Sequence, residues 1–202
     1  TPSKKFSPLS IDKRATHKVK NIGEEHLPIV IADRSNNNGS AINPHFIPDY
    51  VYVGRNVPTD ISKAMKLILD YDVWSDKIDQ YPLFNSSQLD LLGSCPAKLK
   101  FLTLNYTELV KDNLVDQLKH LNDTVIIVET NHINGVGEQR AFMHALLRHD
   151  CTIPVVFHRT YNEDEPEDLQ IKASVDFGTL LLDGFGNGIM LTNTSHSIPS
   201  ID

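Results

Sequence analysis

The chain has 202 residues and a formal net charge of −7, and 40% of its residues are hydrophobic, which suits one globular domain or two small ones. The acidic balance argues against a nucleic-acid-binding surface, because phosphate binding requires clustered Lys and Arg. No apolar run approaches the roughly 18 residues of a membrane span, and no signal-peptide pattern is present.

Residues 1–27 are polar and basic without a sustained period, so we expect a linker or tail there, and another at 194–202. Between them, at 28–193, we expect one barrel-like domain, because short β-branched runs recur along this stretch. Most runs are continuously apolar, which fits strands buried on both faces of a parallel sheet. The expected strands are residues 28–33, 50–54, 67–69, 100–105, 125–130, 154–158, 179–183 and 188–193.

Helical patterns lie between several of these runs. Residues 107–121 place their leucines near one face, with Thr107 as the expected N-cap, and residues 137–150 and 163–176 are also expected to be helical. Alternating strands and helices imply right-handed parallel crossovers. Eight expected strands predict an α/β fold, a (β/α) TIM-like barrel with a closure that could be irregular. An open doubly wound sheet is the alternative.

Three stretches leave their structure open. Residues 60–93 could form helix, strand and loop in more than one order, and loop 34–49 could bind a ligand or be mobile. The sequence "DGFGNG" at 183–188 is not a G-x-G-x-x-G motif, and no helix pattern follows it. It could be a hairpin turn, an irregular closure of the barrel or a phosphate-binding loop.

In a barrel, the residues that follow the strands converge at one mouth, where barrel enzymes hold their active sites. Such residues could bind an anion or move protons, although any strand-to-loop junction turns polar. The candidate rim residues are Asp33, Arg34, Arg55, Asn105, Glu129, Asn131, His132, His158 and Asp183. A metal site at Glu129, His132 and His158 is less favoured than ordinary hydrogen bonding, because no H-E-x-x-H spacing connects them.

The two cysteines, Cys95 and Cys151, are isolated in the sequence. Neither belongs to a C-x-x-C pair, and two thiols cannot by themselves supply the four ligands of a structural zinc or an iron–sulfur cluster. We therefore expect no cofactor and no metal within this segment. Sparse cysteine usage also suits a reducing cytoplasm, and one disulfide stays compatible with it.

Five stretches of the chain carry a family resemblance: "LPIVIADRS", "PDYVYVGRNVPTD", "KFLTLNY", "TNHINGVGEQRA" and "DLQIKASVDFGTLLLDGFGNGIML". Together they resemble the insert domain of three-domain 4-hydroxy-3-methylbut-2-enyl diphosphate synthases, in the form found in Bacteroidetes. The resemblance is collinear from about Leu27 to Asn193. Matched strings of this length are more specific than any single motif above.

The resemblance implies a cytoplasmic bacterial enzyme of isoprenoid biosynthesis, which reductively converts 2-C-methyl-D-erythritol 2,4-cyclodiphosphate to 4-hydroxy-3-methylbut-2-enyl diphosphate. In the family, an N-terminal barrel holds the substrate, and a C-terminal domain binds a [4Fe–4S] cluster that flavodoxin or ferredoxin reduces. The insert lies between them and is mainly architectural. Because the chain begins at Thr1 and Cys95 and Cys151 match no cluster ligand, we expect an excised, non-catalytic insert. The alternative is a barrel with a working, anion-binding rim.

Overall fold

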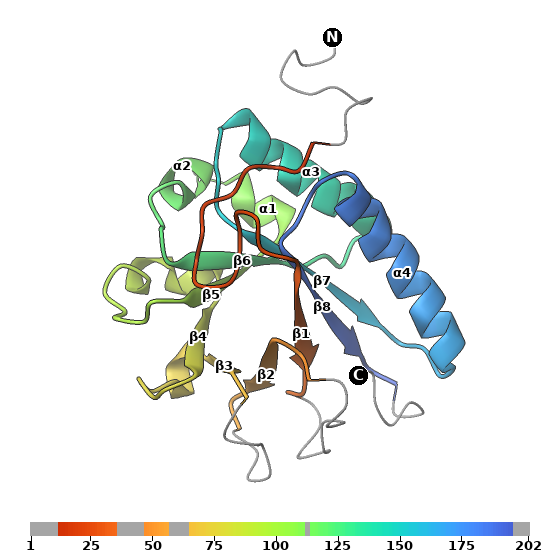
Figure 1. Cartoon of the computed structure of the whole chain (residues 1–202), viewed down its shortest axis with the longest axis horizontal. Coiled ribbons are helices and arrows are strands. Elements are labelled where there is room, and N and C mark those ends of the chain that lie inside the picture. The colour runs from red at the N-terminus through yellow and green to blue at the C-terminus, as the bar shows by residue number, and fades with distance from the viewer. Residues whose placement is uncertain (1–11, 36–46, 57–64, 112–113, 196–202) are drawn as a thin grey trace.

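The computed structural model describes residues 12–35, 47–56, 65–111 and 114–195. Within them, eight parallel strands form a closed barrel, and each strand pairs with the next one along the chain (Figure 1). The strands are β1 Ile29–Asp33, β2 Tyr50–Gly54, β3 Leu67–Asp70, β4 Gln80–Phe84, β5 Lys100–Leu104, β6 Thr124–Val128, β7 Val155–Tyr161 and β8 Gly188–Asn193. The predicted TIM-like barrel is confirmed, and the open sheet is wrong.

Closure of the barrel is regular. Strand β8 pairs with β1 in an unbroken parallel register that places Val30 beside Ile189. The register instead shifts between β2 and β3, near Gly54. The irregularity that the sequence allowed at the closure is therefore found at another seam.

The α-helices lie outside the half of the barrel that contains β5 to β8 (Figure 1). They are α1 Tyr106–Leu109, α2 Leu114–Leu118, α3 Gly135–Arg148 and α4 Pro166–Leu182, and the short 3-10 helices are η1 Tyr71–Val73 and η2 Ser86–Leu91. No helix in the described ranges is long and apolar enough to cross a membrane.

One predicted strand is wrong and one observed strand was not predicted, so the expected and the observed number of strands are both eight. Residues 179–183, predicted as a strand, form the last turn of α4 and the residue that caps it. Their apolar run continues the buried face of α4 through Phe177 and Leu180, and the packing of these two side chains against the core decides for helix. Strand β4, in the ambiguous stretch 60–93, was missed because Pro82 interrupts its short apolar run.

The predicted helix at 107–121 is divided into α1 and α2. Its N-cap is Asn105 and not Thr107: the Asn105 side chain accepts the Glu108 N–H at 2.9 Å, and Glu108 accepts the Asn105 N–H at 2.8 Å. This reciprocal capping box ends β5 and starts the helix within one residue. The other two predicted helices are confirmed as α3 and α4, and α4 extends beyond its expected end.

The barrel interior is a packed apolar core. Its inward-facing side chains include Ile31, Tyr50, Ile68, Phe101, Ile127, Val156 and Met190. The Tyr50 ring meets the Tyr81 and Phe101 rings edge-on, with centroids 5.6 and 5.5 Å apart. Each such buried side chain contributes about 1.5–3 kcal/mol, so the interior stabilises the fold and is not a channel.

The amino end of the barrel is closed by the described part of the expected linker at 1–27. Val19 and Ile22 are 2% and 0% exposed and join the inward-facing core. The buried Arg14 guanidinium donates to the carbonyl of Ile153 at 3.0 Å and also to that of Cys151. This part of the chain therefore packs as part of the domain, while residues 1–11 and 196–202 lie outside the described residues.

The "DGFGNG" stretch connects α4 to β8 at the amino end of the barrel. Gly184 and Gly186 adopt φ values of 76° and 79°, and a Cβ on Gly186 would lie 2.5 Å from the Phe157 ring. The glycines therefore end a helix and admit a core ring. The hairpin and irregular-closure interpretations are wrong, and the loop is at the end opposite to the mouth.

Candidate functional site

A layer of mostly polar side chains covers the core at the carboxyl end of the strands. Side chains alternate along a strand, so the residue two positions after the last inward-facing core residue of each strand also points inward, at the carboxyl end of the barrel. We call these residues the mouth layer. Its members are Asp33, Tyr52, Asp70, Leu83, Thr103, Glu129, His158 and Thr192.

A hydrogen-bonded chain joins four members of the mouth layer across β1, β8, β7 and the end of β6. The Thr192 hydroxyl donates to Asp33 Oδ2 at 2.5 Å, and His158 Nε2 lies 2.8 Å from the same hydroxyl. His158 Nδ1 lies 3.3 Å from Glu129 Oε1. Thr192 gives its only hydroxyl proton to Asp33, so it accepts from His158, and Glu129 can only accept.

On the other side of Asp33, two further members of the mouth layer, Tyr52 and Asp70, are hydrogen-bonded to each other. The Tyr52 hydroxyl donates to Asp70 Oδ1 at 2.7 Å. Burial, and next the hydrogen bond to Asp70, raise the pKa of the Tyr52 phenol well above its ordinary value, so it stays a donor. Ser35 donates both its N–H and its hydroxyl to Asp33 Oδ1, at 2.9 and 2.7 Å. Both oxygens of Asp33 are therefore engaged.

The structure brings together three of the nine predicted rim residues, Asp33, Glu129 and His158. Five others lie near the carboxyl end with other partners or in loops. Arg34 is buried and donates its backbone N–H to the Tyr52 carbonyl, and Asn105 caps α1. Asn131 and His132 are exposed in the loop before α3. Arg55 pairs with Asp72 at 3.4 Å on the outside.

Asp183 is at the wrong end of the barrel for the predicted rim. It caps the C-terminus of α4, and Arg140 of α3 donates to its carboxylate at 2.8 and 2.5 Å. The misplacement follows directly from the wrong strand at 179–183, because a residue after a strand and a residue after a helix lie at opposite ends of a β/α unit. Its role here is to connect α3 to α4.

Tyr52, Asp70 and Thr192 were missed by the sequence analysis. Tyr52 and Thr192 lie inside strands, and only residues after strand ends were considered. Inward-facing parity would have found them, since Tyr50 and Tyr52 alternate with Val51 and Val53. Asp70 directly follows the predicted strand 67–69 and could have been included.

The charge of the mouth layer is unfavourable for an anion. It contains three carboxylates and one histidine, and no Lys or Arg is among its members. The nearby Arg159 points away toward α4, where it pairs with Asp176 at 2.9 Å. The described ranges also contain no group of three His, Cys, Asp or Glu that could hold a metal ion. The arrangement can cap an apolar core with a hydrogen-bonded layer of polar side chains.

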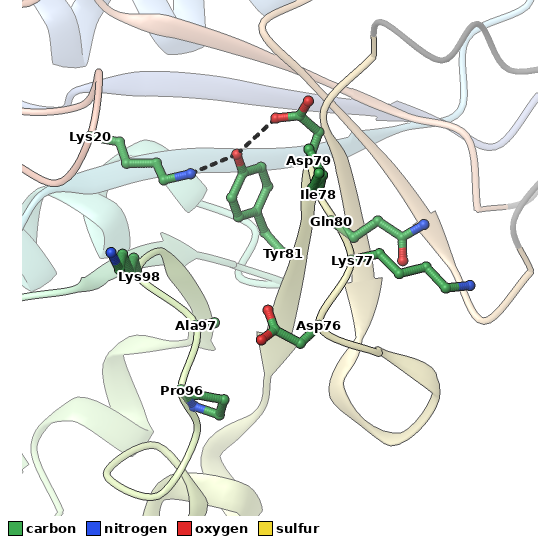
Figure 2. A pocket seen from close by; sticks show the side chains of 10 residues that line it. All are labelled: Lys20, Asp76, Lys77, Ile78, Asp79, Gln80, Tyr81, Pro96, Ala97 and Lys98. Carbon is green, nitrogen blue, oxygen red and sulfur yellow. Dashed lines mark hydrogen bonds between the residues drawn. The ribbon is translucent and has the colours of Figure 1, made fainter.

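A cavity of about 440 Å³ lies at the amino end, between the loop before β4 and the segment before β5 (Figure 2). Lys20 donates to the Tyr81 hydroxyl at 2.8 Å, and that hydroxyl lies 3.4 Å from Asp79 (Figure 2). None of the nine predicted residues lines it. In barrels this end serves stability, and here the N-terminal segment contributes Lys20 to its wall.

Comparison with known proteins supplies the identity that the geometry lacks. The chain is 45% identical over 196 residues to the 4-hydroxy-3-methylbut-2-en-1-yl diphosphate synthase (flavodoxin) of Bacteroides thetaiotaomicron. This alignment covers 96% of the chain and 32% of that protein. Identity to the proteins of the same name is 39% over 188 residues in Parabacteroides distasonis and 33% over 182 residues in Porphyromonas gingivalis. These alignments cover 93% and 89% of the chain, and 30% and 25% of the relatives.

No protein-family model and no solved structure matches the chain. The chain spans about a third of the length of the first two of these curated relatives. The resemblance stated from the sequence is confirmed: nearly the whole chain is homologous to a segment of the 4-hydroxy-3-methylbut-2-en-1-yl diphosphate synthases of Bacteroidetes.

Proposed function

We propose that this chain is the insert domain, with a folded body that extends over about residues 12–195, of a bacterial cytoplasmic 4-hydroxy-3-methylbut-2-en-1-yl diphosphate synthase, and that its role is architectural. The observation that carries the proposal is similarity along 96% of the chain to only 32% of the relative from B. thetaiotaomicron. The complete enzyme would reduce 2-C-methyl-D-erythritol 2,4-cyclodiphosphate to the linear diphosphate, with flanking N-terminal substrate and C-terminal cluster domains as the partners of this barrel.

The geometry supports a spacer. Near the start of the described chain, Arg14 donates its N–H to the Gly184 carbonyl at the amino end of the barrel. Near its end, the Ser195 hydroxyl donates to Asp164 at 2.5 Å, beyond the carboxyl ends of β7 and β8. The described chain therefore enters the barrel at one end and leaves it at the other. A domain attached on each side would be held apart by the length of a rigid barrel.

The cysteines of this segment do not fit a [4Fe–4S] cluster. Cys95 and Cys151 are both buried free thiols. The Cys151 thiol has its pKa raised, chiefly by burial, which disfavours the thiolate that a cluster needs. We therefore assign the cluster to another part of the polypeptide. The reductant in this proposal is flavodoxin, which the relatives' name specifies, with ferredoxin as the alternative.

Replacing the whole folded body of the barrel, residues 12–195 in the numbering of this chain, with a short flexible linker in the complete enzyme tests the proposal. We expect the cluster to assemble with its visible absorbance intact, while turnover falls at least a hundredfold because the flanking domains lose their relative position. A matched control carries Ile133→Ser, a substitution at a fully exposed side chain, and keeps full turnover. Undiminished turnover in the linker variant would refute the architectural role.

The mouth layer is the second candidate, because its hydrogen-bonded chain through His158 is a constructed polar site. If the rim around it binds an anion, inorganic phosphate should shift the NMR signals of residues at the carboxyl end, and Arg55→Ala should abolish the shift. The three carboxylates of the layer favour the opposite result. Unshifted signals at millimolar phosphate, together with unchanged enzyme kinetics in Arg55→Ala, would eliminate this candidate.

A further inference from the structure

The cavity at the amino end of the barrel has the size of a small-molecule site. Its volume of about 440 Å³ lies within the range of ligand pockets in proteins. Its walls come from three separate parts of the chain: the turn at Lys20, residues 76–81 and residues 96–98 (Figure 2). A side chain of the N-terminal segment therefore completes a space between the loops that precede β4 and β5.

Two residues of the cavity wall have a strained backbone. Lys20 and Asp79 adopt φ values of 53° and 59°, in the left-handed region that residues other than glycine enter at a cost in free energy. Lys20 begins a two-residue turn between Val19 and Ile22, whose backbone groups bond to each other at 2.8 and 3.0 Å. Glycine, asparagine or aspartate usually occupies such a turn position, so a lysine there indicates a use for its side chain.

Both strained residues meet the hydroxyl group of Tyr81. Lys20 Nζ donates to this hydroxyl at 2.8 Å and lies 4.4 Å from the centroid of the Tyr81 ring. The hydroxyl donates in turn to Asp79 Oδ1 at 3.4 Å, which is longer than an ordinary O–H···O bond of about 2.5–3.0 Å. Tyr81 is only 5% exposed, so its ring is fixed in place. Its proton is therefore available to a closer acceptor in the cavity.

Two opposite charges on the cavity walls have no partner. The side chains of Asp76 and Lys98 are exposed, and neither forms a hydrogen bond or an ion pair with another residue in the described ranges. In Figure 2, the Asp76 carboxylate points toward the opposite wall at Ala97, whereas Lys77 points away from the cavity. The cavity therefore offers cationic donors from Lys20 and Lys98, and a carboxylate that can accept.

We propose that this cavity binds a small polyhydroxy carboxylate, with its acidic group between Lys20, Lys98 and the Tyr81 hydroxyl. An ammonium group has three N–H donors, and Lys20 uses one of them on Tyr81, so the others are left for the ligand. A carboxylate accepts from ammonium and phenol donors in charge-assisted hydrogen bonds. Asp76 accepts from the hydroxyl groups of the ligand and repels a second acidic group. The lining thus selects a monoanion with hydroxyl groups over a polyanion.

Titration of the 202-residue chain with gluconate, followed by two-dimensional NMR, tests the proposal. Gluconate combines one carboxylate with a chain of hydroxyl groups. We expect saturable shifts confined to residues around the cavity, with a dissociation constant of roughly 0.1–5 mM, because a few charge-assisted hydrogen bonds give weak binding. Acetate lacks the hydroxyl groups and sorbitol lacks the charge, so each should bind at least tenfold more weakly. Shifts that do not saturate, or equal binding of sorbitol, would overturn the proposal.

Lys98→Met and Asp76→Ala separate the two ends of the site. Both side chains are exposed, so both variants should unfold like the wild type. Lys98→Met should weaken gluconate binding at least tenfold, whereas Asp76→Ala should weaken gluconate binding and leave that of acetate unchanged. The matched control is Lys18→Met, at an exposed lysine of the N-terminal segment that does not line the cavity. An equal loss in Lys18→Met and Lys98→Met would reduce the effect to general charge attraction and refute the site.

Lys20→Gly tests the use of the strained residue. Glycine adopts the positive φ without a steric cost, which offsets the lost contact with Tyr81, so the melting temperature should stay close to that of the wild type. Gluconate binding should fall at least tenfold. A lower melting temperature with unchanged binding would mean that Lys20 serves the fold alone, contrary to the proposal.

Calorimetric titration of the complete enzyme determines whether the cavity stays open beside the other domains. We expect gluconate to bind with a dissociation constant within about threefold of that of the chain alone. Binding to the chain without binding to the complete enzyme would show that another part of the polypeptide fills the cavity, and would overturn the assignment to a small molecule. The architectural role can fail in the linker experiment while this site stands, because binding here requires neither flanking domain.

Discussion

Replacing Thr192 with valine removes one hydroxyl group from the mouth layer and keeps the branched shape of the side chain. Thr192 is 7% exposed, and its hydroxyl is the link between Asp33 and His158. The substitution deletes a hydrogen bond to a carboxylate, worth about 1.5–3 kcal/mol, and leaves the Nε2 donor of His158 without its acceptor, at a cost of about 1–3 kcal/mol. The added methyl group recovers a part through apolar burial, roughly 0.8 kcal/mol. The expected net loss in the free energy of unfolding is therefore about 2–5 kcal/mol.

Urea unfolding followed by far-ultraviolet circular dichroism measures this loss. We expect a lower midpoint with an unchanged slope, and a melting temperature that falls by roughly 5–15 °C. Thr160→Val is the matched control, because Thr160 is the cross-strand neighbour of Thr192 on β7 and its side chain is exposed. That control should stay within about 0.5 kcal/mol of the wild type. Equal effects of the two substitutions, or no effect of Thr192→Val, would show that the hydrogen-bonded chain does not stabilise the barrel.

Three further predictions follow from individual side chains. Burial, followed by the positive charges of two arginines on α3, lowers the pKa of His144. The unfolded chain therefore binds this proton more readily, and the free energy of unfolding should decline as the pH falls below about 6.5. His144→Gln should make that decline less steep in unfolding experiments repeated across this pH range. Gly186→Ala should cost more than about 2 kcal/mol, since φ is 79° and the new Cβ meets Phe157, and a melting temperature equal to that of the wild type would contradict this packing. Tyr52→Phe should lose about 1 kcal/mol and remove one phenol that resists ionisation in an alkaline absorbance titration, whereas a Tyr52 that ionises like a free phenol would exclude its bond to a carboxylate.

The sequence by itself determined the class of fold. Runs such as "VIIV" at 125–128 and "VVF" at 155–157 are apolar at every position, and a strand of that kind must be buried on both faces. Alternation of these strands with amphipathic helices requires parallel crossovers, and a barrel follows when enough of them occur in one domain. The helix predicted at 137–150 was also recognisable from the sequence, because its apolar residues recur with the period of an α-helix.

Local pattern was insufficient where two structures suit the same residues. The run "TLLLD" is apolar enough for a strand, and only packing of Phe177 and Leu180 against the core makes it the end of α4. The segment of β4 contains Pro82 and is a weak strand locally, yet it is held between β3 and β5. These two elements were decided by neighbours distant in the chain.

The candidate site depended on tertiary structure still more strongly. The sequence placed polar residues after strands, which brought Asp33, Glu129 and His158 into consideration. It could not show that Thr192 joins Asp33 to His158 or that His158 also meets Glu129, because inward direction depends on the register of four strands that are far apart in the chain. Likewise, Asp183 was predicted at the mouth but lies at the amino end of the barrel, because the element before it is a helix and not a strand. Periodicity is a local property that a sequence carries in full, whereas the meeting of side chains across a barrel is set by register and closure, which exist only once the strands have paired.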